Sequence, residues 1–357
     1  MILDALENFV CFGTAFSLLG FAVAWAARGA TRRRLDAPSP WMLARLYTVA
    51  LALPPLAAAW LVAAAMLPCW WLGEFEFSAA HPAPLHGLHL IGDLTGRLEP
   101  ALAYTVLLLV VGTALLVAWS TAHSYRRLAW AVDRLQLTGA QPPAANIAMV
   151  EDVAKRHGLD VGLVQSDYPM SFVWGFRRSK LVLSSGLLTA LTPGELAGVL
   201  EHEAAHHARR DNLVKLALAV CAHASLAAPL ARRLLRWRSA QIELLCDEIA
   251  AVRSAAPLDI ADALVKLRRQ TQALVPRLAM AASTSRFVPD DDRSVERRVR
   301  RLVALADIAP LHVTAPASPH AAALAFTTLF FLSLVALGSW APLAVHTAAE
   351  AVLQALK

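Results

Sequence analysis

The sequence has no glycine-rich phosphate-binding loop, no internal repeat and no Cys-x-x-Cys pair. These absences argue against a P-loop nucleotide hydrolase, a repeat solenoid and a thioredoxin-like redox protein. The four cysteines are Cys11, Cys69, Cys221 and Cys246. Cys246 lies in a segment that we expect to be cytoplasmic. It should therefore stay reduced and serve as a small buried hydrophobic side chain rather than as a metal ligand.

Charged residues are scarce as well, at 17% of the 357 residues, whereas 57% are hydrophobic. The mean hydropathy of +0.49 is well above that of a soluble enzyme and predicts a membrane protein. Four apolar runs are long enough to cross a hydrocarbon core of about 30 Å. They lie at about residues 5–27, 43–71, 102–119 and 321–345. Pro54 and Pro55 interrupt the second run and predict a kink or a re-entrant element there.

The segments between these runs differ in charge, and this difference predicts the orientation of the chain. Arginines dominate residues 28–45 and recur at 126–134, whereas the segment 72–99 is mainly acidic. The positive-inside rule places the N-terminus and residues 72–99 outside, and the region after the third run in the cytoplasm. Since this rule accounts for the net charge of +6, we expect no direct contact with nucleic acid.

The strongest chemical signal is the sequence His-Glu-Ala-Ala-His at residues 202–206. Residues four apart on an α-helix share one face, so His202 and His206 can bind one zinc ion, with Glu203 as the general base. A capping box with proline at the first helical position, Thr192-Pro193-Gly194-Glu195, precedes the motif and predicts where its helix begins.

A catalytic zinc ion keeps three protein ligands, so a third one is needed. Glu243 is the candidate, on a helix predicted over about residues 240–252. Asp247 lies one turn further along and could accept a hydrogen bond from a ligand imidazole. The alternative is that Glu243, Asp247 and Glu248 form an acidic, solvated face of that helix.

Two short strands are predicted just before the zinc helix, at residues 172–176 and 180–183, joined by Arg177-Arg178-Ser179. An edge strand beside the metal could hold an extended peptide by β-augmentation. An ordinary packing hairpin is the alternative.

A further apolar stretch, residues 213–230, is long enough to span a membrane. If it crossed once, His206 and Glu243 could not meet at one metal ion. We therefore expect a core helix, a helix against the inner leaflet or a short hairpin near Pro229. Near the C-terminus, the spacing of Val295 and Val299 predicts an amphipathic helix over 293–302. We expect its apolar stripe to pack on the catalytic domain, and its arginines could also contact anionic lipid.

These motifs follow one another in an order that resembles a known family. They are Phe172-Val173-Trp174-Gly175-Phe176, Leu187-Leu188, residues 195–200, His202 to His206, Arg209-Arg210-Asp211-Asn212-Leu213, and Glu243 to Asp247. The pattern resembles the integral-membrane zinc peptidases of the BlaR/MecR antirepressor type and their close relatives, the HtpX and CAAX prenyl protease type, over about residues 100–310. The resemblance implies a gluzincin-like domain that binds one Zn²⁺ per chain. His202, His206 and Glu243 would be the ligands, Glu203 the catalytic base and Asp247 the supporting residue.

The sequence thus predicts a polytopic α-helical membrane protein with a cytoplasmic, mainly helical (α+β) gluzincin-like zinc peptidase domain that carries a small β-hairpin or sheet. We expect a membrane unit at 1–122, the metallopeptidase domain at 123–310, a final transmembrane helix at 320–345 and a short external tail at 346–357. The β-lactam-sensing members of the family carry a large penicillin-binding domain at this end. We therefore do not expect antibiotic sensing by this chain.

The resemblance favours a peptidase of the bacterial inner membrane that acts in signal transduction by cleaving a cytoplasmic transcriptional repressor. The expected partners are this protein substrate and the lipid bilayer, and a separate sensor subunit and a homodimer stay open. One alternative is an HtpX-like quality-control protease, against which the short gap between His206 and Glu243 argues. The other is a non-catalytic signalling scaffold, which would have no need of Glu203. His207, Arg209 and Arg210 lie near enough to stabilise an oxyanion, and the spacing does not select among them.

Overall fold

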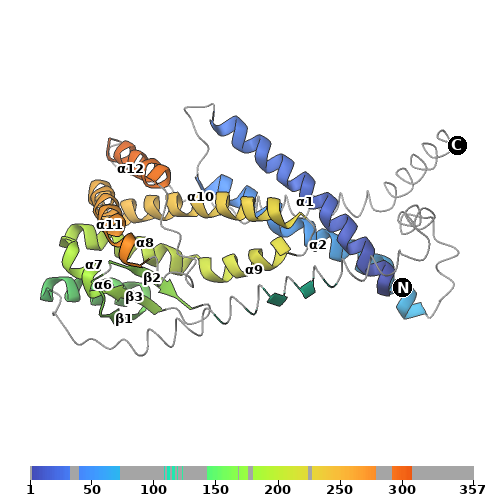
Figure 1. Cartoon of the computed structure of the whole chain (residues 1–357), viewed down its shortest axis with the longest axis horizontal. Helices are drawn as coiled ribbons and strands as arrows, with labels where there is room; N and C mark the ends of the chain where they lie inside the picture. The colour runs from blue at the N-terminus through green and yellow to red at the C-terminus, as the bar shows by residue number, and fades with distance from the viewer. Residues whose placement is uncertain are drawn as a thin grey trace.

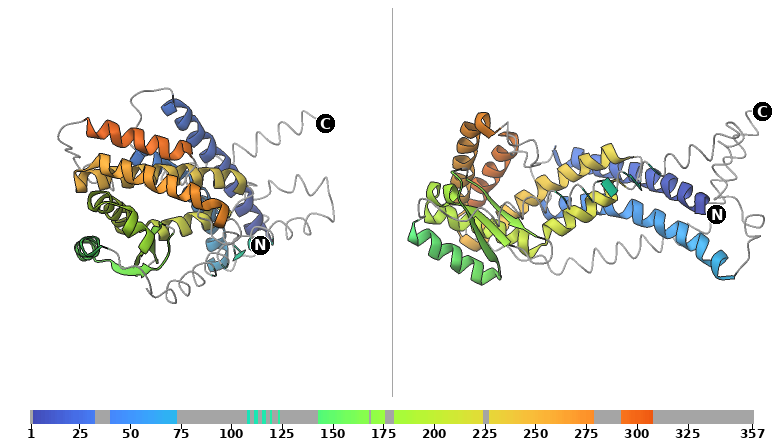
Figure 2. Two further views of the ribbon diagram at one scale, coloured as in Figure 1. Left: turned by 60° about the vertical axis from the view of Figure 1, so that its left-hand side comes forward. Right: turned by 60° about the horizontal axis from the view of Figure 1, so that its bottom comes forward.

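A computed structural model of the chain describes residues 2–32, 40–72, 143–167, 169–175, 180–223, 227–278 and 292–307, with isolated residues between 108 and 123. Two long helices, α1 (Ile2–Arg32) and α2 (Pro40–Leu72), lie side by side and project from one end of a mixed unit of helices and strands (Figure 1). Figure 2 shows the same elongated arrangement from two other sides. The molecule is mainly helical with a small sheet, as predicted.

One helical stretch of the described residues, Pro40–Trp60, is long and apolar enough to cross a membrane by length and composition. Several spans were predicted, and this single candidate does not confirm them. The run 5–27 lies within α1, whereas the runs 102–119 and 321–345 lie largely or wholly outside the described residues. Helix α2 continues through Pro54 and Pro55 without ending, so the re-entrant alternative is wrong.

The sheet has three strands, β1 (Asp160–Val164), β2 (Ser171–Trp174) and β3 (Lys180–Ser184), in the order β1-β3-β2. β2 and β3 are antiparallel, with Phe172 opposite Val182, which confirms the predicted hairpin. Strand β1 was not predicted and pairs in parallel with β3. Because β3 lies in the centre, β2 forms one edge of the sheet.

Seven further helices of the described chain follow. They are α6 (Ala144–His157), α7 (Ser185–Ala190), α8 (Pro193–Ala208), α9 (Asp211–His223), α10 (Ala228–Ser254), α11 (Pro257–Leu278) and α12 (Asp292–Ala306). Of these, α6, α7 and α8 contact this sheet. Helix α8 lies at the centre, where it contacts α6, α10, α11 and β2. Its buried residues Leu196 and Leu200 share one hydrophobic core with Leu181 and Leu183 of β3. Helix α8 is therefore held on several sides by apolar packing.

The start of α8 is fixed by the predicted capping box. The backbone N–H of Thr192 donates to Glu195 Oε2 at 2.8 Å, and the Thr192 hydroxyl accepts from the backbone N–H of Glu195. Gly198 allows α11 to approach closely, because a Cβ atom at that position would lie 2.5 Å from Ile260 Cγ1. The capping box and the close packing of α11 together set the position of the residues that follow on α8.

Helices α9 and α10 form a helical hairpin that returns the chain to α8. The 13 residues of α9 span about 20 Å, less than the thickness of a hydrocarbon core. Leu218 of α9 and Leu234 of α10 pack against Tyr47 and Leu51 of α2. Most of the stretch 213–230 thus forms α9, and the pairing of α9 with α10 brings His206 and Glu243 to the same end.

Candidate metal centre

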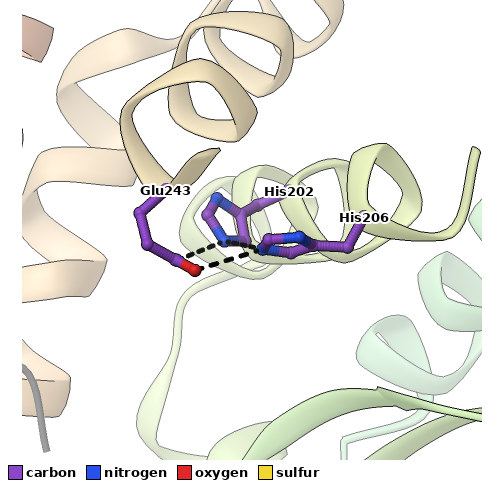
Figure 3. A group of neighbouring side chains, drawn as sticks. All are labelled: His202, His206 and Glu243. Atoms are coloured by element: carbon purple, nitrogen blue, oxygen red, sulfur yellow. Dashed lines mark hydrogen bonds and ion pairs between the residues drawn. The ribbon is translucent and has the colours of Figure 1, made fainter. Parts of the chain in front are cut away.

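Three side chains from two helices converge on one point (Figure 3). His202 and His206 come from α8, and Glu243 comes from α10, which packs along α8. The two imidazole Nε2 atoms are 3.2 Å apart. Glu243 Oε2 lies 3.4 Å from His202 Nε2, and Glu243 Oε1 lies 3.7 Å from His206 Nε2.

These separations fit a tetrahedral zinc ion. With metal–ligand bonds of about 2.0–2.1 Å, two ligand atoms of a tetrahedral site lie about 3.3 Å apart. The three observed distances of 3.2, 3.4 and 3.7 Å are close to that value. Three ligands also leave one corner of the tetrahedron open, which is the feature that distinguishes a catalytic from a structural zinc site.

Each imidazole has its other nitrogen engaged by a carboxylate. His206 Nδ1 lies 2.8 Å from Asp211 Oδ2. His202 Nδ1 lies 2.9 Å from Asp247 Oδ1, an ion-pair distance. A carboxylate at Nδ1 keeps the proton there and turns the Nε2 lone pair toward the metal. That Asp247 would engage a ligand imidazole was predicted, whereas the role of Asp211 was missed.

Arginine side chains lie behind both carboxylates. Arg298 of α12 is buried and donates to both oxygens of Asp247, from Nε at 2.6 Å and from Nη2 at 2.8 Å. Its Nη1 is also 3.6 Å from Glu243 Oε2. Asp211 lies 3.4 Å from Arg209 Nε and 3.9 Å from Arg238 Nη2. Each histidine thus contacts a carboxylate, and that carboxylate in turn contacts at least one guanidinium group.

The electrostatics of this cluster favour a cation. Burial alone would lower the pKa of His202, but hydrogen bonds to Asp247 and Glu243 outweigh burial and raise that pKa to about 9. The pKa of His206 is raised well above its usual range for the same kind of reason, through Asp211. Burial would raise the pKa of Glu243, but its bonds to the two histidines hold it well below its usual range. The carboxylates therefore stay charged and attract positive charge, from protons or from a metal ion.

Glu203 lies on α8 beside the first histidine and is buried. Its Oε1 accepts a hydrogen bond of 2.8 Å from the hydroxyl of Ser171, the first residue of the edge strand β2. Strand and base are thus in direct contact. No pattern in the sequence indicated Ser171, because this contact exists only after β2 packs against α8.

The acidic-face alternative for α10 does not hold in the structure. Asp247 is buried, Glu243 faces the two histidines, and Glu248 pairs with Arg301 of α12. The structure brings together every residue that was predicted for the metal site. Their functions as ligands and as base stay predictions.

Cys246 is fully buried, and its Sγ lies 3.6 Å from His206 Nδ1. Together with Asp211 it could form a second group of potential ligands. However, Asp211 is only 2.8 Å from His206 Nδ1, a hydrogen-bond distance shorter than the about 3.3 Å expected between two zinc ligands. Cys246 is therefore better explained as the buried hydrophobic side chain that was predicted.

Sequence comparison with known proteins identifies the central part of the chain. Residues 143–274 match peptidase family M48. The matched segment resembles an M48 peptidase domain. It contains the histidine pair, Glu203, Glu243 and both carboxylate partners, and it ends before α12. Arg298 thus reaches the M48 domain from outside the matched segment.

Two curated relatives are similar to this chain. The Protease HtpX homolog of Acidiphilium cryptum is 34% identical over 127 residues, which cover 32% of this chain and 43% of that protein. The Protease HtpX homolog of Gemmatimonas aurantiaca is 26% identical over 221 residues, which cover 52% of this chain and 78% of that protein. The chain thus spans less than half of the first relative's length. No solved structure gives a significant match.

The M48 domain and these relatives confirm the predicted enzyme class, a zinc metallopeptidase. They do not confirm the BlaR/MecR subtype, because both relatives are named as HtpX homologs.

Proposed function

We propose that this protein is a membrane-bound zinc endopeptidase whose M48 domain cleaves extended segments of other proteins. The observation that carries the proposal is the convergence of His202, His206 and Glu243 at zinc-ligand distances. A zinc ion bound there would polarise the peptide carbonyl and make water a better nucleophile near neutral pH.

Glu203 supplies the proton transfers. As a carboxylate beside the metal ligands, it takes a proton from the attacking water and then passes it to the departing amine. The hydroxyl of Ser171 donates to Glu203 and holds that carboxylate in one orientation. Ser171 thus acts as a positioning residue.

The edge strand β2 gives the proposal a means of holding the substrate. Among the described residues, β2 pairs with β3 on one side only, so its other side can accept the backbone of an extended peptide. Because Ser171 lies on β2 and contacts Glu203, such a peptide would run beside the base. Backbone pairing is largely independent of side chains, which suits an enzyme that cuts unfolded or flexible segments.

The proposed location is the bacterial inner membrane, in several passes, with the N-terminus outside and the M48 domain in the cytoplasm. Helix α2 supports it as a candidate span, and so does the charge distribution of the loops. Exposed apolar side chains on α1 and α2, such as Leu19, Trp25 and Leu56, suit a lipid environment.

Two kinds of substrate are proposed. The first is a cytoplasmic transcriptional repressor, which would make the protein part of a signalling system, with a sensor subunit and a homodimer still open. The second is unfolded protein, as for an HtpX-like quality-control protease. The two relatives named as HtpX homologs support this second proposal at least as well as the first. A non-catalytic scaffold is the weakest proposal, because Glu203 is retained and held beside the ligand set.

The test compares the full chain, purified in detergent with zinc, with the Glu203→Gln variant. Glu151→Gln, an exposed substitution on α6, serves as the control. Each protein is given a candidate repressor and unfolded casein. Cleavage of the repressor alone, lost in Glu203→Gln, supports the signalling proposal, and cleavage of casein supports the quality-control proposal. If neither is cut while zinc is bound at one ion per chain, the endopeptidase proposal fails for these substrates, and the scaffold gains support.

A further inference from the structure

A polar cavity lies where helix α2 meets α10 and the end of α8. Its volume is ≈ 130 Å³, several times the roughly 30 Å³ that one water molecule occupies in the liquid. Three arginines line it, Arg45 of α2, Arg209 after α8 and Arg238 of α10, together with Trp41 and Thr48 of α2. The cavity does not include the three predicted zinc ligands.

Positive charge gathers around this cavity. Asp211 is the carboxylate that approaches the arginines, at 3.4 Å from Arg209 Nε and 3.9 Å from Arg238 Nη2. It is also hydrogen-bonded to His206. The carboxylate that Arg209 and Arg238 approach is thus already shared with a histidine. The pKa of Arg45 is lowered by burial and by the charge of Arg209, which shows that the arginines repel one another.

The three side chains are held in place rather than spread into solvent. Arg238 is buried, and its Nε donates to Thr48 Oγ1 at 2.9 Å. The guanidinium of Arg45 stacks on Trp41, 3.8 Å from the centre of the ring. The Nε atom of Arg209 is buried and has no hydrogen-bond partner. An oriented group of donors with one unsatisfied member is what an oxyanion site requires.

We propose that this cavity binds a phosphate group, through Arg45, Arg209 and Arg238. The planar guanidinium fork matches the oxygens of phosphate, and burial strengthens such charge-assisted bonds. The bound phosphate group could belong to the head group of an anionic phospholipid, or it could be free inorganic phosphate. The position of Arg45 in the first turns of α2, the candidate membrane span, makes a lipid head group an accessible source.

The experiment uses the full chain in nanodiscs and the wild type beside four variants. Arg45→Gln and Arg209→Gln each remove one guanidinium, and Arg45→Lys keeps the charge without the fork. Arg233→Gln is the control, because Arg233 is exposed on α10 and does not line the cavity. Inorganic phosphate is titrated by calorimetry into nanodiscs of phosphatidylcholine alone. A second series uses nanodiscs with phosphatidylglycerol, and retained lipid is counted by native mass spectrometry.

We expect Arg45→Gln and Arg209→Gln each to weaken phosphate binding by at least about tenfold, with Arg233→Gln like wild type and Arg45→Lys in between. If a lipid head group is the occupant, phosphatidylglycerol blocks the phosphate titration and stays bound to wild type and Arg233→Gln only. If free phosphate is the occupant, phosphatidylglycerol changes nothing. Equal binding of both probes by wild type and the two glutamine variants overturns the proposal.

A folding defect is separated from a binding defect by the unfolding temperature of each variant without phosphate. If Arg209→Gln lowers that temperature, its effect on binding is set aside and Arg45→Gln provides the test of phosphate binding. Arg45 suits this purpose because it forms none of the described contacts with Asp211. None of these readouts uses peptide cleavage, so the phosphate site and the proposed peptidase function can fail independently.

Discussion

At the scale of single residues, the metal centre depends on which nitrogen of each imidazole is already engaged. Asp247 and Asp211 hold the two Nδ1 atoms, so both Nε2 atoms face Glu243. The histidine pair was predictable because its spacing is local to one helix. The partner Asp211 was not, since it lies beyond the end of α8 and meets His206 only through the turn at Arg210, which has a positive φ of 51°.

Asp211→Asn tests this arrangement. The amide keeps the size of the side chain but removes the charge that holds the proton on His206 Nδ1. We expect zinc affinity to fall by about 10- to 100-fold, as for other carboxylate partners of metal-bound histidines. Competition with a chelator of known affinity measures the change. Asp152→Asn, at an exposed pair with Arg156, is the control. Unchanged affinity in Asp211→Asn would show that the carboxylate has no part in metal binding.

At the scale of elements, the sequence predicted α8, the β2–β3 hairpin and α12. Each of these elements has a signal within its own segment: a capping box for α8, strand-forming residues for the hairpin and helical spacing of apolar residues for α12. It did not predict β1, a short strand that contains Gly162 and is stabilised by its parallel partner β3. Helix α6 was not predicted either; it begins at Ala144, and Pro143 precedes it as its N-cap. These differences arise from tertiary contacts that no local pattern records.

The capping box of α8 is expected to contribute to stability. Thr192→Ala removes the hydroxyl that accepts from the N–H of Glu195, so the free energy of unfolding should fall by about 1 kcal/mol. Chemical denaturation of the metal-free protein measures it. Thr192→Ser keeps the hydroxyl and should stay close to wild type. Equal losses in both variants would point to packing of the methyl group instead of the cap.

Helix α12 should act as part of the metal centre through Arg298. Arg298→Gln leaves Asp247 and Glu243 without their guanidinium partner, so we expect about tenfold weaker zinc binding. Faster hydrogen exchange in α12 should accompany it. Arg300→Gln is the matched control, because Arg300 pairs with Glu296 on the exposed side of the same helix. If both variants bind zinc alike, α12 has no influence on the ligands.

At the scale of the whole molecule, the metal-free centre couples stability to pH. The folded-state pKa of His202 is about 9, whereas an unfolded histidine titrates near about 6.5. A raised folded pKa gives stability that is fully present below the unfolded value and is lost as pH rises through the folded one. The chain without zinc should therefore lose stability between about pH 6.5 and pH 9.

Thermal unfolding in detergent with a chelator, at intervals across this range, measures the effect. Asp247→Asn should flatten the pH dependence, because it removes the largest contact that raises the pKa. Added zinc should reverse the trend, since the metal competes with protons for the same nitrogens and binds more tightly as pH rises. A metal-free protein that becomes more stable toward pH 9 would contradict this account.

The reach of Arg298 from α12 has a consequence for moving this domain between proteins. Sequence similarity to M48 ends at residue 274, while the guanidinium that holds Asp247 and Glu243 lies further along the chain. A domain transplanted at the borders of similarity would carry every predicted zinc ligand and still lack that arginine. The portable unit is therefore larger than the family match, because it must include α12.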